Sequence, residues 1–225
     1  PHEYKAVFSP ADVIEEYLRP ARFVENNEMV VKEALTDIEN VNFPGIGTLE
    51  SFNTDGLRTL AFTLNGVADM KEKTLRYPGH VAFMQKLRAS GFFSKQSVES
   101  NGVRFVPLEF TSAMLFKQWK YNDGDADFTI MRVDLVGREK GVHTKYTYHL
   151  LDRFDQESGF SSMARTTGFT CTAAVQILAS GDYTEKGIAP PEYIGMDERR
   201  FRRVVNYLAE RNVVLKVEKS LVHDR

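Results

Sequence analysis

The segment FTIMRVDLVGREKGVHTKYTYHLLDRF, residues 128–154, decides the fold. Residues 128–136 and 142–154 predict the two strands of a long antiparallel hairpin, because residues 137–141 between them begin and end with glycine. In the second strand, every other side chain points to the same face. One face carries Val142, Thr144, Tyr146, Tyr148 and Leu150, and the other carries His143, Lys145, Thr147, His149 and Arg153. We expect the first face to pack and the second to be solvated, to form an interface or to serve a function.

Helical and strand patterns alternate irregularly around this hairpin. Helices are predicted from Ser9-Pro10 to Pro20, from His80 to a stop at Gly91, and over residues 57–64, 107–120, 161–180 and 197–211. Shorter strands are predicted at residues 22–25, 28–32, 39–43, 48–52, 67–77 and 213–217. No regular strand–helix–strand rhythm is present, which favours an α+β fold with a mixed, largely antiparallel sheet and helices on one face. We expect residues 1–225 to form a single domain.

The composition of the chain argues against two classes of partner, nucleic acids and membranes, and favours one compartment. The 225 residues carry a net charge of −2, so no positive excess exists to neutralise phosphates, and we expect no nucleic-acid partner. No apolar run reaches the roughly 20 residues that cross a bilayer, so no membrane partner is expected. The single cysteine, Cys171, cannot form an internal disulfide, which favours the cytoplasm. The chain begins at Pro1 without an initiating Met, which suggests a fragment or a processed chain.

Neither a nucleotide loop nor a metal site emerges from the motifs. Gly45-Ile46-Gly47 follows a predicted strand, but the third glycine of a dinucleotide fingerprint would fall at Glu50, whose charge would repel a pyrophosphate. A simple turn is therefore the favoured interpretation. His143 and His149 are six residues apart on one strand, too far to bind the same metal ion. We expect neither a cofactor-binding residue nor a metal ligand in this chain.

Two short segments could bind a small molecule. Asn53 and Asp55 lie between a strand and a helix, where they would either cap the helix or hold an amino or carboxylate group. Arg76 can clamp a carboxylate, and Tyr77 and His80 can exchange protons or form hydrogen bonds. The alternative for residues 76–80 is an ordinary strand-to-helix turn with a solvated arginine and a capping histidine.

One face of the predicted helix 161–180 is built from small side chains: Ser161, Ala164, Gly168, Thr172 and Val175. Such a face allows another element to approach closely. It either packs in the core or serves as a docking face for a domain that this chain lacks.

Four segments, taken in order, resemble the glutamate-forming saccharopine dehydrogenases. These are ESFNTDG (50–56), TLRYPG (74–79), SMARTTG (162–168), and Gly181-Asp182 followed by GIAP (187–190). The resemblance extends from about Phe8 to Lys219. It implies the second domain of that family, with a sheet like that of the glyceraldehyde-3-phosphate dehydrogenase substrate domain. The N-terminal Rossmann domain that binds NAD(P) would be absent, so no cofactor is expected on this chain alone.

The resemblance also implies a function. The family joins an amino acid to an aldehyde through an imine that NAD(P)H reduces to a secondary amine, or runs the reverse, as saccharopine dehydrogenases and carboxynorspermidine synthases do. We therefore expect an oxidoreductase domain for substrate binding and homodimerisation, inactive alone, on which the Rossmann domain docks at residues 161–175. Lysine metabolism or polyamine biosynthesis would be its setting. The alternative is a non-catalytic dimerisation or small-molecule-binding module.

Site residues follow from this resemblance together with the motifs. Asn53 and Asp55 would hold the substrate amine, and Arg76 would pair with a carboxylate. Tyr77 and His80 would act at the reacting nitrogen, while Thr166 and Thr167 would line the cleft facing the nicotinamide. Two departures leave the substrate open. The family's loop arginine is Thr54 here, and the family's early S-P-R-G segment, whose arginine meets a substrate carboxylate, reads Ser9-Pro10-Ala11-Asp12. An amine in place of a carboxylate would suit Asp12.

Overall fold

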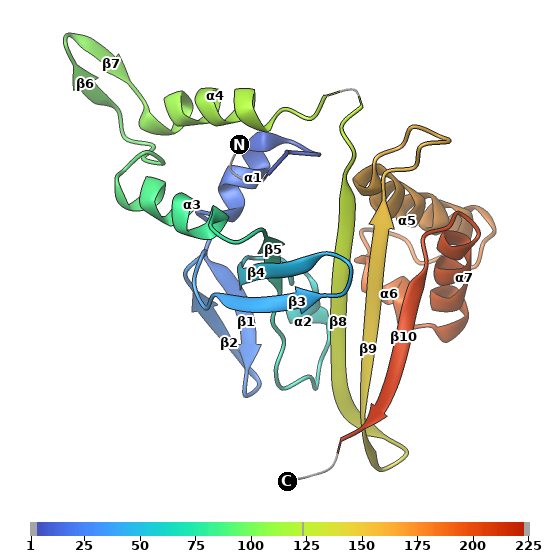
Figure 1. The fold of residues 1–225 in the computed structure, drawn as a ribbon. Helices are drawn as coiled ribbons and strands as arrows, with labels where there is room; N and C mark the ends of the chain where they lie inside the picture. Colours follow the sequence, from blue (N-terminus) through green and yellow to red (C-terminus); the bar gives the residue numbers. More distant parts are fainter. Residues whose placement is uncertain (1–3, 123, 223–225) are drawn as a thin grey trace. The chain divides into compact units, whose positions relative to one another are not determined.

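The computed structural model describes residues 4–122 and 124–222, which form two compact units, 1–123 and 124–225 (Figure 1). Helices and antiparallel strands are mixed in both units, which confirms the α+β class. The prediction of a single domain stays a prediction. Among the described residues, no helix is both long and apolar enough to cross a membrane.

The first unit combines short strands with three principal helices. Its elements are α1 (Pro10–Glu16), β1 (Ala21–Glu25), β2 (Glu28–Lys32), β3 (Glu39–Phe43), β4 (Gly47–Asn53), α2 (Leu60–Thr63), β5 (Lys73–Arg76), α3 (His80–Ala89), β6 (Val98–Ser100), β7 (Val103–Phe105) and α4 (Pro107–Trp119). β1 pairs with β2, β6 pairs with β7, and β3, β4 and β5 form a sheet in that order, all antiparallel.

Helices α1, α3 and α4 share the main core of this unit. Val13, Tyr17, Met84 and Trp119 are fully buried in it. Pro10 occupies the first turn of α1, as predicted, but Ser9 makes no side-chain capping bond. α3 starts after Gly79, whose φ of 96° lies in the left-handed region that glycine adopts without strain.

The second unit packs two helices on a three-stranded sheet. Its elements are β8 (Phe128–Glu139), β9 (Val142–Arg153), α5 (Ser162–Ala179), α6 (Pro191–Gly195), α7 (Glu198–Ala209) and β10 (Leu215–Leu221). The antiparallel order is β10-β9-β8. Ser161 caps α5 by accepting the Ala164 N–H at 3.1 Å, and Asp127 accepts the N–H groups of Ser162 and Met163. The predicted hairpin is confirmed, with a first strand three residues longer than expected.

The helices cover only one end of one sheet face. Met131, Leu150 and Leu215 pack there against Phe169 and Leu208. Beyond that end the strands continue past the helices (Figure 1), and Val133, Leu135 and Val217 on the same face are 37%, 53% and 51% exposed. The packed face predicted for β9 is therefore packed only in part.

The opposite face of this sheet is polar, as predicted. Asp134 forms ion pairs with Arg132 and Lys145, both at 3.3 Å, and accepts a hydrogen bond from Thr147. His149 lies 3.9 Å from Glu218. The contacts of Asp134 with Lys145 and Thr147 join β8 to β9, and His149 lies near Glu218 of β10.

Several boundaries differ from the prediction. The strand expected over residues 67–77 is limited to β5, and the helix expected over 57–64 is limited to α2. Arg58 and Gly66 both have positive φ, which neither a helix nor a strand accommodates. The β6–β7 hairpin and α6 were not predicted.

Candidate functional site

Five of the seven predicted site residues lie in the first unit. Asn53 ends β4, Asp55 follows it, Arg76 ends β5, and Tyr77 and His80 lead into α3. β4 and β5 are adjacent and antiparallel, and the side chains of Thr54 and Thr74 join them through a 2.8 Å hydrogen bond. The structure thus places the two predicted segments on neighbouring strands.

Asp55 forms an ion pair with Arg22 of strand β1. Its carboxylate accepts hydrogen bonds from the backbone N–H, Nε and Nη2 of Arg22, and its side chain is only 4% exposed. The hydrogen bonds from Arg22 lower the pKa of the Asp55 carboxyl below its usual value. Asp55 is therefore ionised and holds β1 against the loop after β4.

Asn53 is fully buried, and of its two side-chain polar atoms only the amide nitrogen has hydrogen-bond partners among the described residues. Its Nδ2 donates to Thr36 Oγ1 and Asp37 Oδ2, both at 2.9 Å. Its Oδ1 has no hydrogen-bond partner among the described residues. This amide oxygen is an acceptor that an amine N–H could fill.

Arg76 is enclosed rather than solvated. Its Nη2 donates to Glu16 at 3.2 Å, its Nη1 donates to the carbonyl of Leu75, and the ring of Tyr4 lies 4.6 Å from the guanidinium carbon. Only 14% of the side chain is exposed. The solvated arginine of the alternative interpretation is not found, because the Glu16 carboxylate and the Tyr4 ring already surround the Arg76 guanidinium.

His80 joins two helices in the core. Its Nε2 lies 2.9 Å from the hydroxyl of Tyr17, the residue at the C-terminal cap of α1, and both residues are buried. Tyr77 is half-buried in the turn before α3, and its carbonyl accepts the His80 N–H. The capping histidine considered as the alternative is not found, since His80 packs inward.

Thr166 and Thr167 lie on α5 in the second unit. Their hydroxyls donate to the carbonyls of Ser162 and Met163 one turn earlier in the same helix. Thr167 is exposed and Thr166 is half-buried.

A small hollow adjoins the loop after β4. Its volume is about 100 Å³, and it is lined by Glu16, Arg19, Thr54, Asp55, Gly56, Arg58, Glu72 and Thr74. Glu72, which sequence reasoning missed, accepts the Thr54 hydroxyl at 2.6 Å. Burial raises the pKa of the Glu72 carboxyl, and the charges of Glu16 and Asp55 raise it further. The hollow therefore contains both charged and hydroxyl groups that could orient a small polar ligand.

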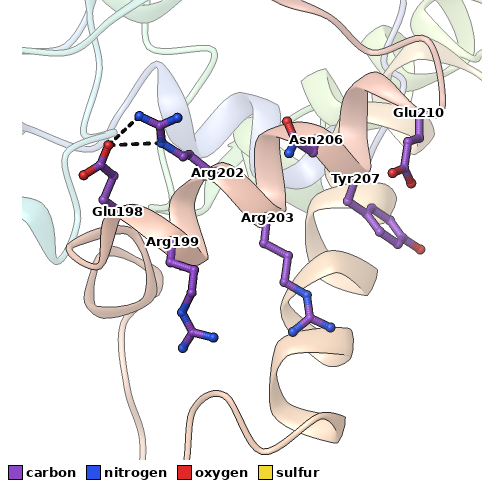
Figure 2. A pocket seen from close by; sticks show the side chains of 7 residues that line it. All are labelled: Glu198, Arg199, Arg202, Arg203, Asn206, Tyr207 and Glu210. Carbon is purple, nitrogen blue, oxygen red and sulfur yellow. Dashed lines mark hydrogen bonds and ion pairs between the residues drawn. The ribbon is translucent and has the colours of Figure 1, made fainter.

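A wider and shallower hollow of about 730 Å³ runs along α7 (Figure 2). Arg199 and Arg203 both bond to Asp182, and Arg202 pairs with Glu198 one turn away. These groups neutralise one another on an exposed helix. The residues of β4, β5 and the loop after β4 in the first unit therefore remain the stronger candidate site.

The structure also tests the glycine turn considered as a nucleotide loop. Residues 43–47 join the antiparallel strands β3 and β4, and the Ile46 N–H bonds to the Phe43 carbonyl. The turn interpretation is confirmed, because a phosphate loop would lead into a helix. The residues present here do not fit a dinucleotide. No group of three or more His, Cys, Asp or Glu within residues 4–122 and 124–222 is arranged to hold a metal ion.

Comparison with known proteins identifies the family. A sequence model described as the saccharopine dehydrogenase C-terminal domain matches residues 1–213. A curated saccharopine dehydrogenase [NADP(+), L-glutamate-forming] of Schizosaccharomyces pombe (strain 972 / ATCC 24843) is 27% identical over 133 residues. The alignment covers 59% of this chain and 28% of that relative, so the chain matches less than a third of its relative's length. The chain therefore belongs to the saccharopine dehydrogenase C-terminal domain family, an oxidoreductase family.

Proposed function

We propose that this chain is the substrate-binding and dimerisation part of an NAD(P)-dependent oxidoreductase that acts on the CH–NH bond of a secondary amine. The enzyme would condense an amino acid or amine with an aldehyde reductively, or run the reverse. The observation that carries this proposal is the family match over residues 1–213. The similarity to the Schizosaccharomyces pombe relative supports it, since that protein is a saccharopine dehydrogenase.

The site residues would divide the work by charge. Arg76 would bind a substrate carboxylate, and the free Oδ1 of Asn53 would accept an amine N–H. Asp55 would contribute its negative charge to the amine while it holds the loop through Arg22. Tyr77 and His80 would form hydrogen bonds at the reacting nitrogen, with His80 oriented by Tyr17.

The nicotinamide nucleotide would supply the hydride from a domain other than the described residues, and we expect that domain to dock on α5. The face predicted for docking is open, since Ala164, Gly168 and Thr172 are exposed and Val175 is 52% exposed. Nothing lies within 4 Å of the Cβ that a substitution would add at Gly168. Thr166 and Thr167 would face the nicotinamide from this helix.

We further propose a cytoplasmic homodimer. The uncovered apolar side chains Val133, Leu135 and Val217 support a second copy on the β8–β10 sheet, because a soluble chain rarely leaves such side chains clustered in water. The single, exposed Cys171 supports a reducing compartment.

A direct assay tests the reaction. The complete gene product would be mixed with NADH or NADPH, an aldehyde and a panel of amino acids and diamines, and nucleotide oxidation would be followed. Consumption that requires both the aldehyde and one amine class is expected. If no pair consumes the nucleotide in either direction, the enzyme proposal is wrong, and a non-catalytic dimerisation or binding module takes its place.

A further inference from the structure

Residues 4–6 form a strap across the end of α4. The Ala6 N–H donates to the Trp119 carbonyl at 2.8 Å, in an isolated parallel bridge between Ala6 and Lys120. Lys5 Nζ reaches the Lys120 carbonyl at 3.0 Å from an exposed position. The backbone of the strap is thus attached to the helix end by a bridge one residue long.

Tyr4 at the start of the strap covers three side chains that the site uses or adjoins. Its ring lies 4.6 Å from the guanidinium carbon of Arg76, 5.4 Å from the centre of the His80 ring and 5.2 Å, edge to face, from the Trp119 ring. Burial raises the pKa of the Tyr4 hydroxyl. In this closed position, Tyr4 blocks one face of Arg76.

Two donors under the strap lack acceptors. The indole N–H of Trp119, a fully buried residue, and the Nε–H of Arg76 have no hydrogen-bond partner among the residues the structure describes. Buried N–H groups without acceptors destabilise the state that contains them. The closed strap therefore encloses an environment in which an acceptor with negative charge would be favoured.

We propose that residues 4–6 are a movable cover, and that their displacement opens a carboxylate-binding site in which Trp119 and Arg76 donate hydrogen bonds. This inference rests on the proposed function in one respect, the assignment of Arg76 as a carboxylate receptor. In the closed structure Glu16 forms an ion pair with Arg76, so a ligand carboxylate must also compete with Glu16 for the guanidinium.

Mobility is tested by amide hydrogen exchange in the 225-residue chain. The structure offers a matched control, because Val24 and Met70 also form an isolated bridge, with a 3.0 Å bond from the Val24 N–H. The Ala6 amide should exchange about a hundredfold faster than the Val24 amide, since the strap opens without the rest of the unit. Equal protection of the two amides would show that the strap is fixed and would overturn the cover.

Binding is tested with glutarate, using the fluorescence of Trp119, the single tryptophan of the chain. Glutarate should change this fluorescence saturably, whereas 1,5-diaminopentane, the diamine of equal length, should not. Tyr4→Ala should lower the glutarate Kd about threefold or more, because less of the protein is in the covered state. Glu16→Gln should lower it as well, by releasing Arg76.

The core variant Phe116→Ala separates these effects from general loosening. Phe116 packs against the same hydrophobic cluster but is not one of the three side chains that the Tyr4 ring covers, so its substitution should leave the glutarate Kd unchanged. Failure of glutarate to bind the wild type and both Tyr4→Ala and Glu16→Gln would overturn the carboxylate site. The proposed reaction would still be judged separately, by nucleotide consumption.

Discussion

Arg22 donates two parallel side-chain hydrogen bonds to Asp55, from Nε at 2.9 Å and from Nη2 at 2.8 Å, and adds a third from its backbone N–H. This pairing joins strand β1 to the loop that follows β4, 33 residues away. A residue that the sequence marks as a substrate contact therefore has a structural role as well.

Asp55→Asn should destabilise the chain by about 1–3 kcal/mol, because one oxygen that accepts from Arg22 becomes a donor. The lowered pKa of Asp55 means that its contribution is fully present above the ordinary Asp value of 3.8 and is lost as pH falls through the lower, folded-state pKa. The difference in Tm between wild type and variant should thus shrink in acid. Asp12→Asn, at an exposed position, serves as control. A Tm equal to that of the wild type at pH 7 would contradict the pairing.

Gly56→Ala should displace Glu72, because the added Cβ would lie 2.3 Å from the Glu72 carboxyl carbon. The far end of that side chain can move, so we expect a cost below about 1.5 kcal/mol, with loss of the Thr54 bond. In a double-mutant cycle of urea denaturation, Gly56→Ala should cost nothing further once Glu72→Ala is present. Additive costs would show that the two residues do not collide.

Arg165→Met should be the most damaging of these changes. Arg165 and Asp152 form an ion pair with side-chain exposures of 8% and 4%, and Arg165 also bonds to the Arg211 carbonyl. Removing one partner leaves the other charge buried, which costs about 3–5 kcal/mol. Arg202→Met is the matched control, since its pair with Glu198 is exposed and should contribute less than about 1 kcal/mol. Similar urea midpoints for the two variants would be inconsistent with this difference.

Leu135→Lys should convert the proposed dimer to a monomer. Leu135 lies on the part of the helix-covered sheet face that the helices do not reach, and a charge there would oppose burial in a dimer. Val136→Lys, at a neighbouring position that is 59% exposed on the opposite face, should leave the dimer intact. Light scattering after size exclusion distinguishes the outcomes. Dimers that persist in both variants would exclude this face.

Gly168→Leu should leave this chain folded and reduce the oxidoreductase activity proposed for the complete gene product tenfold or more. Gly168 is exposed with open space around it, so the Tm should change by less than about 2 °C. Thr170→Leu places the same side chain on another side of α5 and should preserve activity. Full activity of the Gly168 variant would place the docking surface elsewhere.

Local sequence patterns predicted most of the fold. The β8–β9 hairpin follows from alternation along one strand, and Asn26-Asn27 predicts the β1–β2 turn because both adopt positive φ. The strand expected over residues 67–77 is longer than the one found, because residues 67–72 include Ala, Asp, Lys and Glu, which are depleted in strands. They lie outside the strands apart from an isolated bridge of Met70 with Val24.

The site was predictable only in outline. The sequence motifs single out Asn53, Asp55 and Arg76, but only the structure shows that their segments lie side by side, because β4 pairs with β5. The partners of these residues come from distant segments. Arg76 meets Glu16 and Tyr4, and His80 meets Tyr17 63 residues earlier. Such pairings depend on tertiary packing and have no local periodicity that would reveal them. No sequence motif contains Glu72, and it is identified as a candidate site residue only by its burial in the folded structure, which raises the pKa of its carboxyl.

The threonines of α5 alter how that helix meets a neighbour. Thr166, Thr167, Thr170 and Thr172 all donate their hydroxyl hydrogens to carbonyls within their own helix. With the donors engaged internally, the methyl groups remain available for contact, and the threonine positions of the helix resemble valine positions. Exchange of threonine for valine along this helix should therefore be tolerated better than exchange for serine, which keeps the hydroxyl and deletes the methyl.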